Sequence, residues 1–335
     1  MKKMFSLALL STAAMLVSCW TDGEGKIKNP DWTIEPGTAG DFQKIREDAL
    51  RDMMIMQTFD AATGIDFTSP KGVRFTLSSM WHGDWTQVTG DVTLEYIELF
   101  DRGSMVVGNK PLKGYDAAGN LIPLITGGEF YINVTQNGES VFGYYNMVIP
   151  GSLTGGVDKR DGLDPMTLWL GEIDDETGDL FWREFGAEDG RDGNKEGGVW
   201  PDGESNNYNL FGSDFGWINV DVLSGEEGEK TPLLVSVPEG YDNTNASVYV
   251  AYVGQTDRLA FLDVYSPANK LFTEHYGWAP IGFELYVIFT AEENGQFVYS
   301  IKKVTIAKET IIYVTQAELL TGIRDEVIAA INALP

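Results

Sequence analysis

Apolar and polar positions alternate in three stretches of the chain, at residues 73–77, 92–96 and 129–135. A period of two places every second side chain on the same face of a sheet, where it can be buried against a second layer. Asn137 and Gly138 follow the third stretch, and both tolerate the positive φ that a two-residue hairpin turn requires. The pattern therefore predicts a first β-sandwich built around residues 73–142.

A second set of strand-like runs occupies the chain from Thr231 to Tyr313. Asn294 and Gly295 form another hairpin signal inside this set. Six short runs in so short a segment favour a small antiparallel sandwich of immunoglobulin or transthyretin type. The runs are residues 233–237, 247–252, 259–264, 283–289, 297–306 and 310–314.

Two segments show the periodicity of a helix instead. Residues 41–56 begin at Asp41, which can cap a helix, and carry apolar residues at steps of three and four. Near the end of the chain, Thr315 and Glu318 form a capping box before an apolar stripe that should dock on the second sandwich. The stripe consists of Leu319, Ile323, Val327, Ile331 and Leu334. The expected fold class is all-β, with two β-sandwich-like domains and a few short helices, including this C-terminal amphipathic helix.

The first residues have the layout of a signal peptide. Lys2 and Lys3 precede an apolar stretch, residues 4–17, that is too short to span a bilayer as a stable helix. Leu16-Val17-Ser18-Cys19 then resembles a lipoprotein signal, in which the cysteine thiol is joined to diacylglycerol and the new N-terminus is acylated. Cys19 is the only cysteine in the chain, so an ordinary secretory signal with an accidental cysteine is the less favoured alternative. The prediction is a protein held on a membrane by lipid chains.

The glycines and prolines after Cys19 predict a flexible tether. Asp22 and Glu24 within it resemble an export signal to the outer face of the cell in Bacteroidota, which favours surface exposure. The expected organisation is a signal peptide at 1–18, a tether at 19–40, a helix and first sandwich at 41–150, an acidic segment rich in glycine and aromatic residues at 151–228, and a second sandwich with its helix at 229–335.

The acidic segment is the one place where the sequence hints at a ligand. Between Glu172 and Glu204 there are 12 acidic and three basic residues, with seven glycines among them. Hard cations take such oxygen ligands from loops, so Ca²⁺ could bind at Asp174, Asp175, Asp189 and Asp192, although the spacing does not match an EF-hand. Exposed aromatic residues beside carboxylates would instead suit a sugar, with Trp182, Trp200 and Tyr208 as the candidate contacts. The simplest interpretation is an acidic, solvated loop over a core that holds most of these rings.

Charge and motif content narrow the function classes. The net charge of −26 over 335 residues repels phosphate backbones, so nucleic acid is not an expected partner. The two histidines, His82 and His275, are far apart and have no metal-ligand spacing. Nucleophile-elbow, Walker and dinucleotide motifs are absent from the sequence. A glycosidase needs only two carboxylates, and among 50 acidic residues no pair can be chosen.

Several segments together resemble a family of surface lipoproteins from Bacteroidota. They are Ser69–Val73, Gly90–Leu94, Ser104-Met105, Gly127–Tyr131, Phe215–Asp221, Thr273–Gly277 and Pro280–Gly282. The likeness covers most of the chain after Cys19, and the first domain is also distantly similar to the β-sandwich shared by ankyrins and netrin receptors. This resemblance implies an architecture and a location, and it assigns no catalytic residue.

Taken together, these features predict a lipid-anchored cell-envelope protein at the outer membrane with a non-catalytic binding or structural role. The expected partners are the membrane, through the lipid on Cys19, and a surface glycan or protein. No cofactor is expected, with Ca²⁺ as the one candidate. The alternative is a glycoside hydrolase or an accessory glycan-binding subunit, which a pair of carboxylates in a groove would reveal.

Overall fold

The computed structural model describes residues 20–21, 27–28, 36–116, 118–157, 165–173, 179–186, 196–213, 215–223, 228–274 and 279–335. The chain divides into two compact units, Met1–Ile34 and Glu35–Pro335. In the first unit, β1 (Trp20–Thr21) pairs antiparallel with β2 (Ile27–Lys28). No helix in the described part of the chain is long and apolar enough to cross a membrane.

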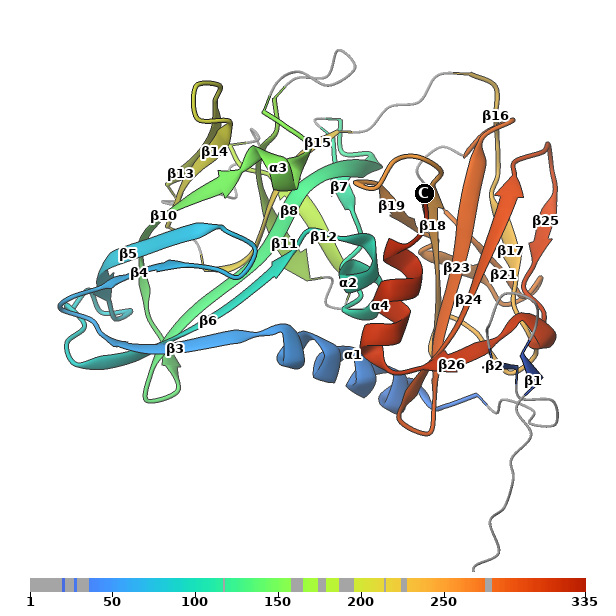
Figure 1. The fold of residues 1–335 in the computed structure, drawn as a ribbon, viewed down its shortest axis with the longest axis horizontal. Helices are drawn as coiled ribbons and strands as arrows, with labels where there is room; N and C mark the ends of the chain where they lie inside the picture. Colours follow the sequence, from blue (N-terminus) through green and yellow to red (C-terminus); the bar gives the residue numbers. More distant parts are fainter. Residues whose placement is uncertain are drawn as a thin grey trace, which may run out of the picture. The chain divides into compact units, whose positions relative to one another are not determined.

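The larger unit contains two β-sandwiches, which Figure 1 shows one on each side of a pair of short helices. One sheet of the first sandwich has five strands in the order β13-β14-β10-β5-β4. These strands are β4 (Ile65–Thr68), β5 (Arg74–Trp81), β10 (Phe142–Pro150), β13 (Gly197–Asp202) and β14 (Asn207–Gly212). All their pairings are antiparallel.

The other sheet of the first sandwich has eight strands. Seven follow the order β15-β11-β12-β7-β8-β6-β3, and β9 (Glu139–Ser140) pairs with the end of β8. The seven are β3 (Ile55–Asp60), β6 (Asp91–Leu99), β7 (Lys113–Tyr115), β8 (Leu121–Gln136), β11 (Thr167–Ile173), β12 (Leu180–Glu184) and β15 (Gly216–Leu223). Because β15 also pairs with the long β8, the strands β8, β7, β12, β11 and β15 close into a ring at this end of the sheet.

The alternation in the sequence explains the core between these two sheets. The apolar residues of the three predicted stretches face it and are buried, among them Phe75, Leu94 and Phe130. The turn between β8 and β9 has positive φ at both Asn137 (54°) and Gly138 (85°), as the hairpin signal predicts. The predicted all-β fold is confirmed by this arrangement.

Residues 151–228 differ from the expectation of a separate acidic segment. After a short helix, α3 (Gly151–Thr154), they supply β11 to β15, of which β14 pairs with β10, β12 with β7 and β15 with β8 of the first sandwich. Alternation is present here too, because Leu180 and Trp182 are buried while Phe181 between them is partly exposed. The abundance of acidic residues and glycines conceals this pattern, and the first sandwich extends to Leu223.

The second sandwich packs a four-stranded sheet, β20-β21-β17-β25, on a five-stranded sheet, β19-β18-β23-β24-β26. Its strands are β17 (Leu234–Ser236), β18 (Ala246–Tyr252), β19 (Leu259–Phe261), β20 (Val264–Ser266), β21 (Leu271–Thr273), β23 (Glu284–Glu293), β24 (Gln296–Thr305), β25 (Ile311–Tyr313) and β26 (Leu320–Gly322). A further pair, β16 (Lys230–Thr231) and β22 (Ala279–Pro280), lies apart from both sheets. All pairings are antiparallel except β17 with β25, which is parallel.

Both predicted helices form, with shifted starts. Helix α1 (Ala39–Met53) is capped by Thr38, and Asp41 completes a reciprocal capping box at its third position. The capping box at Thr315 and Glu318 is real, but it caps only a 3-10 turn, η1 (Gln316–Glu318). Residues 320–322 then pair with β24 as β26, so helix α4 begins at Arg324 and runs to Asn332. Sheet pairing with a distant strand overrides the local helical pattern here.

The two sandwiches meet on the outer face of the eight-stranded sheet, which we call the junction face. Helix α2 (Arg102–Val107) is buried there against α4, and a Cβ on Gly103 would lie 2.6 Å from the carbonyl oxygen of Ile328. Rings from both sides share one apolar cluster, including Trp169 and Trp182 from the first sandwich and Tyr249 from the second. Strands β18 and β23 are therefore apolar on both faces, because each face is covered.

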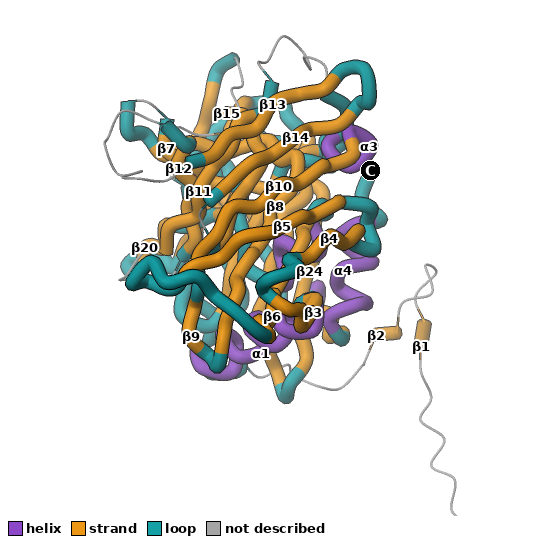
Figure 2. Tube along the Cα trace, turned by 90° about the vertical axis from the view of Figure 1, so that its left-hand side faces the viewer, coloured by secondary structure: helices purple, strands orange, loops and turns teal. Residues whose placement is uncertain are grey.

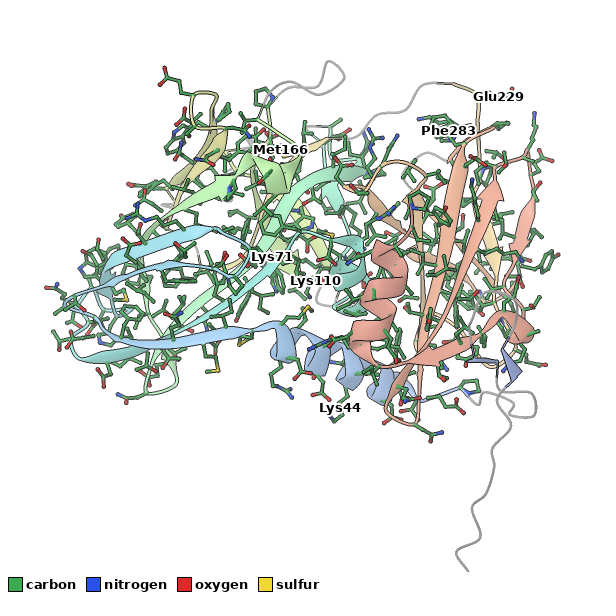
Figure 3. The ribbon with its side chains drawn as sticks, viewed as in Figure 1. Lys44, Lys71, Lys110, Met166, Glu229 and Phe283 are labelled. Atoms are coloured by element: carbon green, nitrogen blue, oxygen red, sulfur yellow. The ribbon has the colours of Figure 1, made fainter. Side chains whose placement is uncertain are left out.

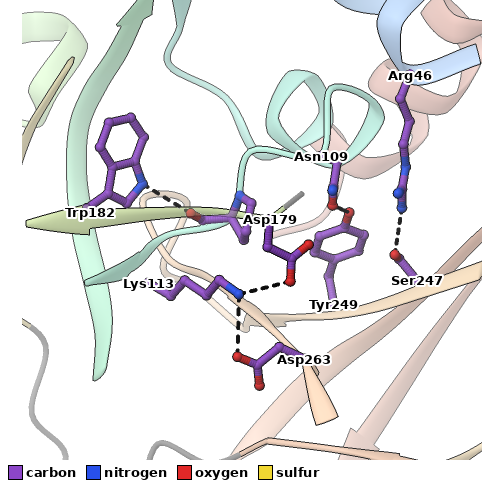
Figure 4. A network of polar contacts seen from close by, with 9 residues as sticks. Arg46, Asn109, Lys113, Asp179, Trp182, Ser247, Tyr249 and Asp263 are labelled. Carbon is purple, nitrogen blue, oxygen red and sulfur yellow. Dashed lines mark hydrogen bonds and ion pairs between the residues drawn. The ribbon is translucent and has the colours of Figure 1, made fainter. Parts of the chain in front are cut away.

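A network of polar contacts also crosses the junction face (Figure 4). Lys113 of β7 contacts Asp179 at 3.2 Å and Asp263 at 3.5 Å, with its side chain almost fully buried. Two hydrogen bonds link the second sandwich to α1 and to the loop after α2. In these bonds Arg46 Nη2 donates to Ser247 Oγ at 2.6 Å, and Tyr249 Oη donates to Asn109 Oδ1 at 2.5 Å. Separating the two sandwiches would break these buried hydrogen bonds and ion pairs, which costs free energy. The contacts therefore hold the sandwiches together as one unit.

Candidate binding surface

The outer face of the five-stranded sheet is the opposite case, and we call it the open face. Figure 2 looks directly at strands β13, β14, β10, β5 and β4, and no described helix lies over them. Along β10 the residues at 143, 145, 147 and 149 are buried, so the side chains at 142, 144, 146 and 148 point outward. The open face is therefore the surface on which this sheet can meet a partner.

Five aromatic rings form a connected row on the open face, which we call the aromatic row. Its members, in order, are Trp85, Phe142, Trp81, Tyr144 and Phe211. Consecutive ring centroids lie 4.8, 6.0, 5.9 and 5.7 Å apart. The row crosses from the turn after β5, over β10, to β14.

Trp200 of β13 continues the row on the far side. It is the register partner of Asn209, and Gly198 is the partner of Phe211, so Trp200 lies diagonally next to Phe211 on the same face. A Cβ on Gly198 would meet no atom of the described residues within 4 Å. The glycine leaves the ring of Phe211 uncovered on that side, and Trp200 is 50% exposed.

Trp85 stands at the other end of the aromatic row and is 70% exposed. It occupies a tight turn in which its amide donates to the carbonyl of His82 at 2.9 Å, while Asp84 Oδ1 accepts from the amide and hydroxyl of Thr86. These bonds favour ionised Asp84 and lower its carboxyl pKa. The backbone of Trp85 has a φ of 68°, in the left-handed region that bulky residues rarely adopt. A strained conformation that displays a large apolar ring to solvent is a sign of function.

A β-bulge also shapes the centre of the row. The register between β10 and β5 shifts between Tyr144 and Tyr145, which pair with Ser79 and Leu77. Bulges redirect side chains and are frequent beside functional sites. The extra residue here is Ser78 of β5, and because of it Met80 is buried in the core while Trp81 faces the open face.

Uncharged polar side chains border the aromatic row. Asn146 is the register partner of Phe211 on one side and of Thr76 on the other, and Asn209 lies opposite Val148. Asp66 and Arg74, on the strands beyond, are exposed and form a two-pronged ion pair at 2.6 and 2.9 Å. Amide and hydroxyl groups beside exposed rings offer hydrogen bonds and apolar contact to the same ligand.

Several predicted site residues lie outside the described part of the chain. They are Cys19, Asp174, Asp175, Asp189, Asp192 and His275. Within the described ranges, no group of three or more histidine, cysteine, aspartate or glutamate side chains could hold a metal ion. The lipid site and the Ca²⁺ candidate therefore stay predictions.

The three predicted aromatic contacts separate into two kinds. Trp182 is fully buried on the junction face, where its indole Nε1 donates to the carbonyl of Pro111 at 3.1 Å. Tyr208 is buried in the core of the first sandwich. As contacts to an external ligand these two are wrong, because neither ring reaches the surface. Trp200 alone among them offers an exposed ring.

A pair of buried carboxyl groups lies on the junction face and bears on the hydrolase alternative. Glu129 and Asp221 are both fully buried, and both carboxyl oxygens of Glu129 lack a hydrogen-bond partner among the described residues. Burial, and then repulsion from Asp221, raises the pKa of Glu129 well above its usual value; burial likewise raises the pKa of Asp221. Lys110, which lies near the middle of the view in Figure 3, is partly buried, and desolvation lowers its pKa to about 8. Neither carboxyl group of the pair reaches solvent, so a substrate in this conformation cannot meet them.

The aromatic row itself is not found by reading the sequence as a series of motifs. A signal for it does exist: Trp81-His82-Gly83-Asp84-Trp85 places two tryptophans around a turn, and Phe142 and Tyr144 extend an alternating run whose other face is also apolar. Comparison with known protein families and with curated proteins finds no match for this chain. The open face is accordingly the candidate site on geometry alone.

Proposed function

We propose that this chain is a non-catalytic binding protein of the cell envelope, anchored by lipid on Cys19 and binding its ligand on the open face of the first sandwich. The observation that carries the binding half is the aromatic row, with Trp200 beside it and Trp85 held at positive φ. Exposed apolar surface of this kind is rare on soluble domains without a partner, because it costs free energy in water. The anchoring half is supported by the sequence around Cys19.

The rigidity of the supporting sheet favours a binding role. Four of the five rings of the aromatic row belong to strands β5, β10 and β14, whose inner faces are fixed by the buried residues Leu77, Tyr145 and Leu210. Side chains on strands are held more precisely than side chains on loops. A ligand would therefore find the rings already in place and would lose little affinity to ordering them.

Anchoring is tested by the substitution Cys19→Ala in the full-length protein expressed in a bacterial host with an outer membrane. We expect an alkyne fatty acid to label the parent protein and not the variant, and the variant to leave the membrane fraction. Equal labelling of both proteins would contradict lipid attachment at Cys19. Protease treatment of intact cells then separates outward exposure, which predicts digestion, from a periplasmic orientation, which predicts protection.

Binding on the open face is tested with the triple variant Trp85→Asn, Tyr144→Ala, Trp200→Ala. All three side chains are exposed, so the variant should fold, which a circular dichroism spectrum checks. We expect it to lose binding to every probe that the parent protein retains. A triple variant that binds as the parent does would move the binding site elsewhere.

A further inference from the structure

We infer that the ligand of the open face is an uncharged glycan chain that lies along the aromatic row. This inference rests on the proposed function and names the chemical class of its ligand. It depends on three features of the described residues: the chemistry of the row, the charge around it, and its linear form.

The chemistry of the row fits a pyranose better than a purely apolar ligand. One face of a pyranose ring presents C–H groups that stack on an aromatic ring, and its rim carries hydroxyl groups that both donate and accept hydrogen bonds. Tyr144 and Phe211 supply adjacent stacked rings, with an interplanar angle of 9°. Asn146, the register partner of Phe211, and Asn209 beyond it supply amide groups able to donate and accept. Each sugar could thus use a ring for its face and an amide for its rim.

The charge around the row favours an uncharged chain. Two acidic residues lie beside the row, Asp84 next to Trp85 and Asp202 two positions from Trp200 on β13, and both accept hydrogen bonds within their own turns. Farther along the sheet, Asp66 and Arg74 are paired with each other. The whole chain carries a net charge of −26, which repels uronic acids, sulfated sugars and phosphates. A single-stranded nucleic acid could stack on the same rings, but it requires a positively charged groove along its backbone.

The linear form of the row favours an extended polymer over a folded protein. Each ring contacts the next, and the strand register carries the rings diagonally across the sheet from Phe142 and Tyr144 on β10, through Phe211 on β14, to Trp200 on β13. Protein interfaces usually place their aromatic residues in a compact patch that is sealed by a surrounding rim. A line of rings bordered by amides instead offers a repeating set of contacts, which suits a chain of repeating units.

Trp85 gives the row a fixed end. Its turn, with a φ of 68° at Trp85, places the indole in contact with Phe142, with ring centroids 4.8 Å apart and an interplanar angle of 79°. Side-chain order that exists before binding lowers the entropy cost of binding. The strain in this turn therefore has a use, since it sets one ring at an angle to the rest of the row.

The test measures binding of the full-length protein in detergent micelles by affinity electrophoresis and calorimetry. The probes are neutral polysaccharides (a β-glucan, a xylan and a mannan), the charged polysaccharides polygalacturonate and heparin, and gelatin as a protein. The variants are Trp85→Asn, Tyr144→Ala and Trp200→Ala. The controls are Tyr313→Ala and Met56→Ala, which remove equally exposed side chains from β25 and β3.

We expect at least one neutral polysaccharide to bind, each row variant to weaken that binding about tenfold or more, and both controls to bind as the parent does. Binding of gelatin or a charged polysaccharide alone, lost in the row variants, would overturn the glycan inference and keep the open face as the binding surface. Neutral-glycan binding that the row variants leave unchanged would overturn the open face itself. Failure of all six probes to bind would contradict both.

Discussion

The two outer faces of the first sandwich use the same residue types for opposite purposes. On the junction face, Trp169 and Trp182 are fully buried, and each indole nitrogen donates to a backbone carbonyl, of Asp221 and Pro111 respectively. On the open face, Trp85 and Trp200 are at least half exposed. Both pairs are carried by strands or turns of one sandwich, so local structure does not account for the difference.

What separates the two faces is coverage by distant parts of the chain. Helix α2 and the second sandwich cover the junction face and supply the apolar groups that bury its rings, while the acceptors of the indole nitrogens come from β15 and from the residues before β7. Nothing described covers the open face. A tryptophan at the surface of a sheet is therefore a packing residue where the fold supplies its partner, and a binding residue where the partner must come from outside.

Removing one tryptophan from each face gives the largest expected difference between the two faces. Trp182→Ala should cost about 3–5 kcal/mol of unfolding free energy, because it leaves a cavity and an unpaired carbonyl at Pro111. Trp200→Ala should change that free energy by no more than about 0.5 kcal/mol. Guanidinium unfolding followed by circular dichroism measures both. Equal costs would mean that the two rings are equally packed, against the structure.

A second effect separates the faces by pH. The pKa of Glu129 is raised in the folded protein by burial and by Asp221, so the folded state holds a proton that the unfolded chain releases at lower pH. The stability that this proton contributes is complete below the unfolded pKa, and it is lost as pH rises toward the folded pKa. Unfolding free energy measured between about pH 5 and pH 7 should therefore fall less steeply with pH in Glu129→Gln than in the parent protein.

The matched control for this pH effect is Glu139→Gln, which makes the same substitution at an exposed position on strand β9. Lys110 acts with the opposite sign at higher pH. Desolvation lowers the pKa of Lys110 in the folded protein to about 8, from the usual 10.5. Burying its charge lowers the unfolding free energy, and this loss is recovered as pH rises from about 8 to 10.5. A Glu129→Gln variant with the same pH slope as the parent would contradict a protonated, buried Glu129.

The smallest expected effect concerns the turn at Trp85. Asparagine enters the left-handed region at low cost, whereas alanine at a φ of 68° keeps the strain. Trp85→Asn should therefore be more stable than Trp85→Ala by up to about 1 kcal/mol, although both lose the ring. Thermal unfolding of the two variants side by side measures the difference. An alanine variant as stable as the asparagine variant would show that the backbone at Trp85 is not strained.

Much of the fold follows from local pattern. The alternating stretches around Phe75, Leu94 and Phe130 form buried strands, and the turns at Asn137-Gly138 and Asn294-Gly295 have positive φ throughout, because few other residue pairs allow it. The cap of α1, Thr38, lies three residues before the predicted cap Asp41, and the predicted capping box at Thr315 and Glu318 forms, although it caps η1 and not the C-terminal helix. These features depend on residues that are close in the sequence, so they can be predicted from the sequence alone.

The remaining features depend on contacts between distant segments. The run from Leu319 to Leu334 has a helical stripe, but pairing of residues 320–322 with β24 delays the helix. Leu180 and Trp182 alternate as a strand should, yet acidic residues around them conceal it. The candidate site is even harder to predict from the sequence. Phe142 and Tyr144 face outward while Tyr145 faces inward, and no local pattern shows which of two aromatic faces the second sandwich will cover.

The central claim is that the open face binds a ligand, and residue-level protection tests it most directly. Hydroxyl-radical footprinting of the full-length protein, read by mass spectrometry with and without the tightest-binding probe, reports the exposure of each aromatic ring. We predict that the ligand protects Trp85, Tyr144 and Trp200 and leaves Tyr313 and Met56 as reactive as before. Protection that spares these three rings and appears on β25 or β3 would contradict the account.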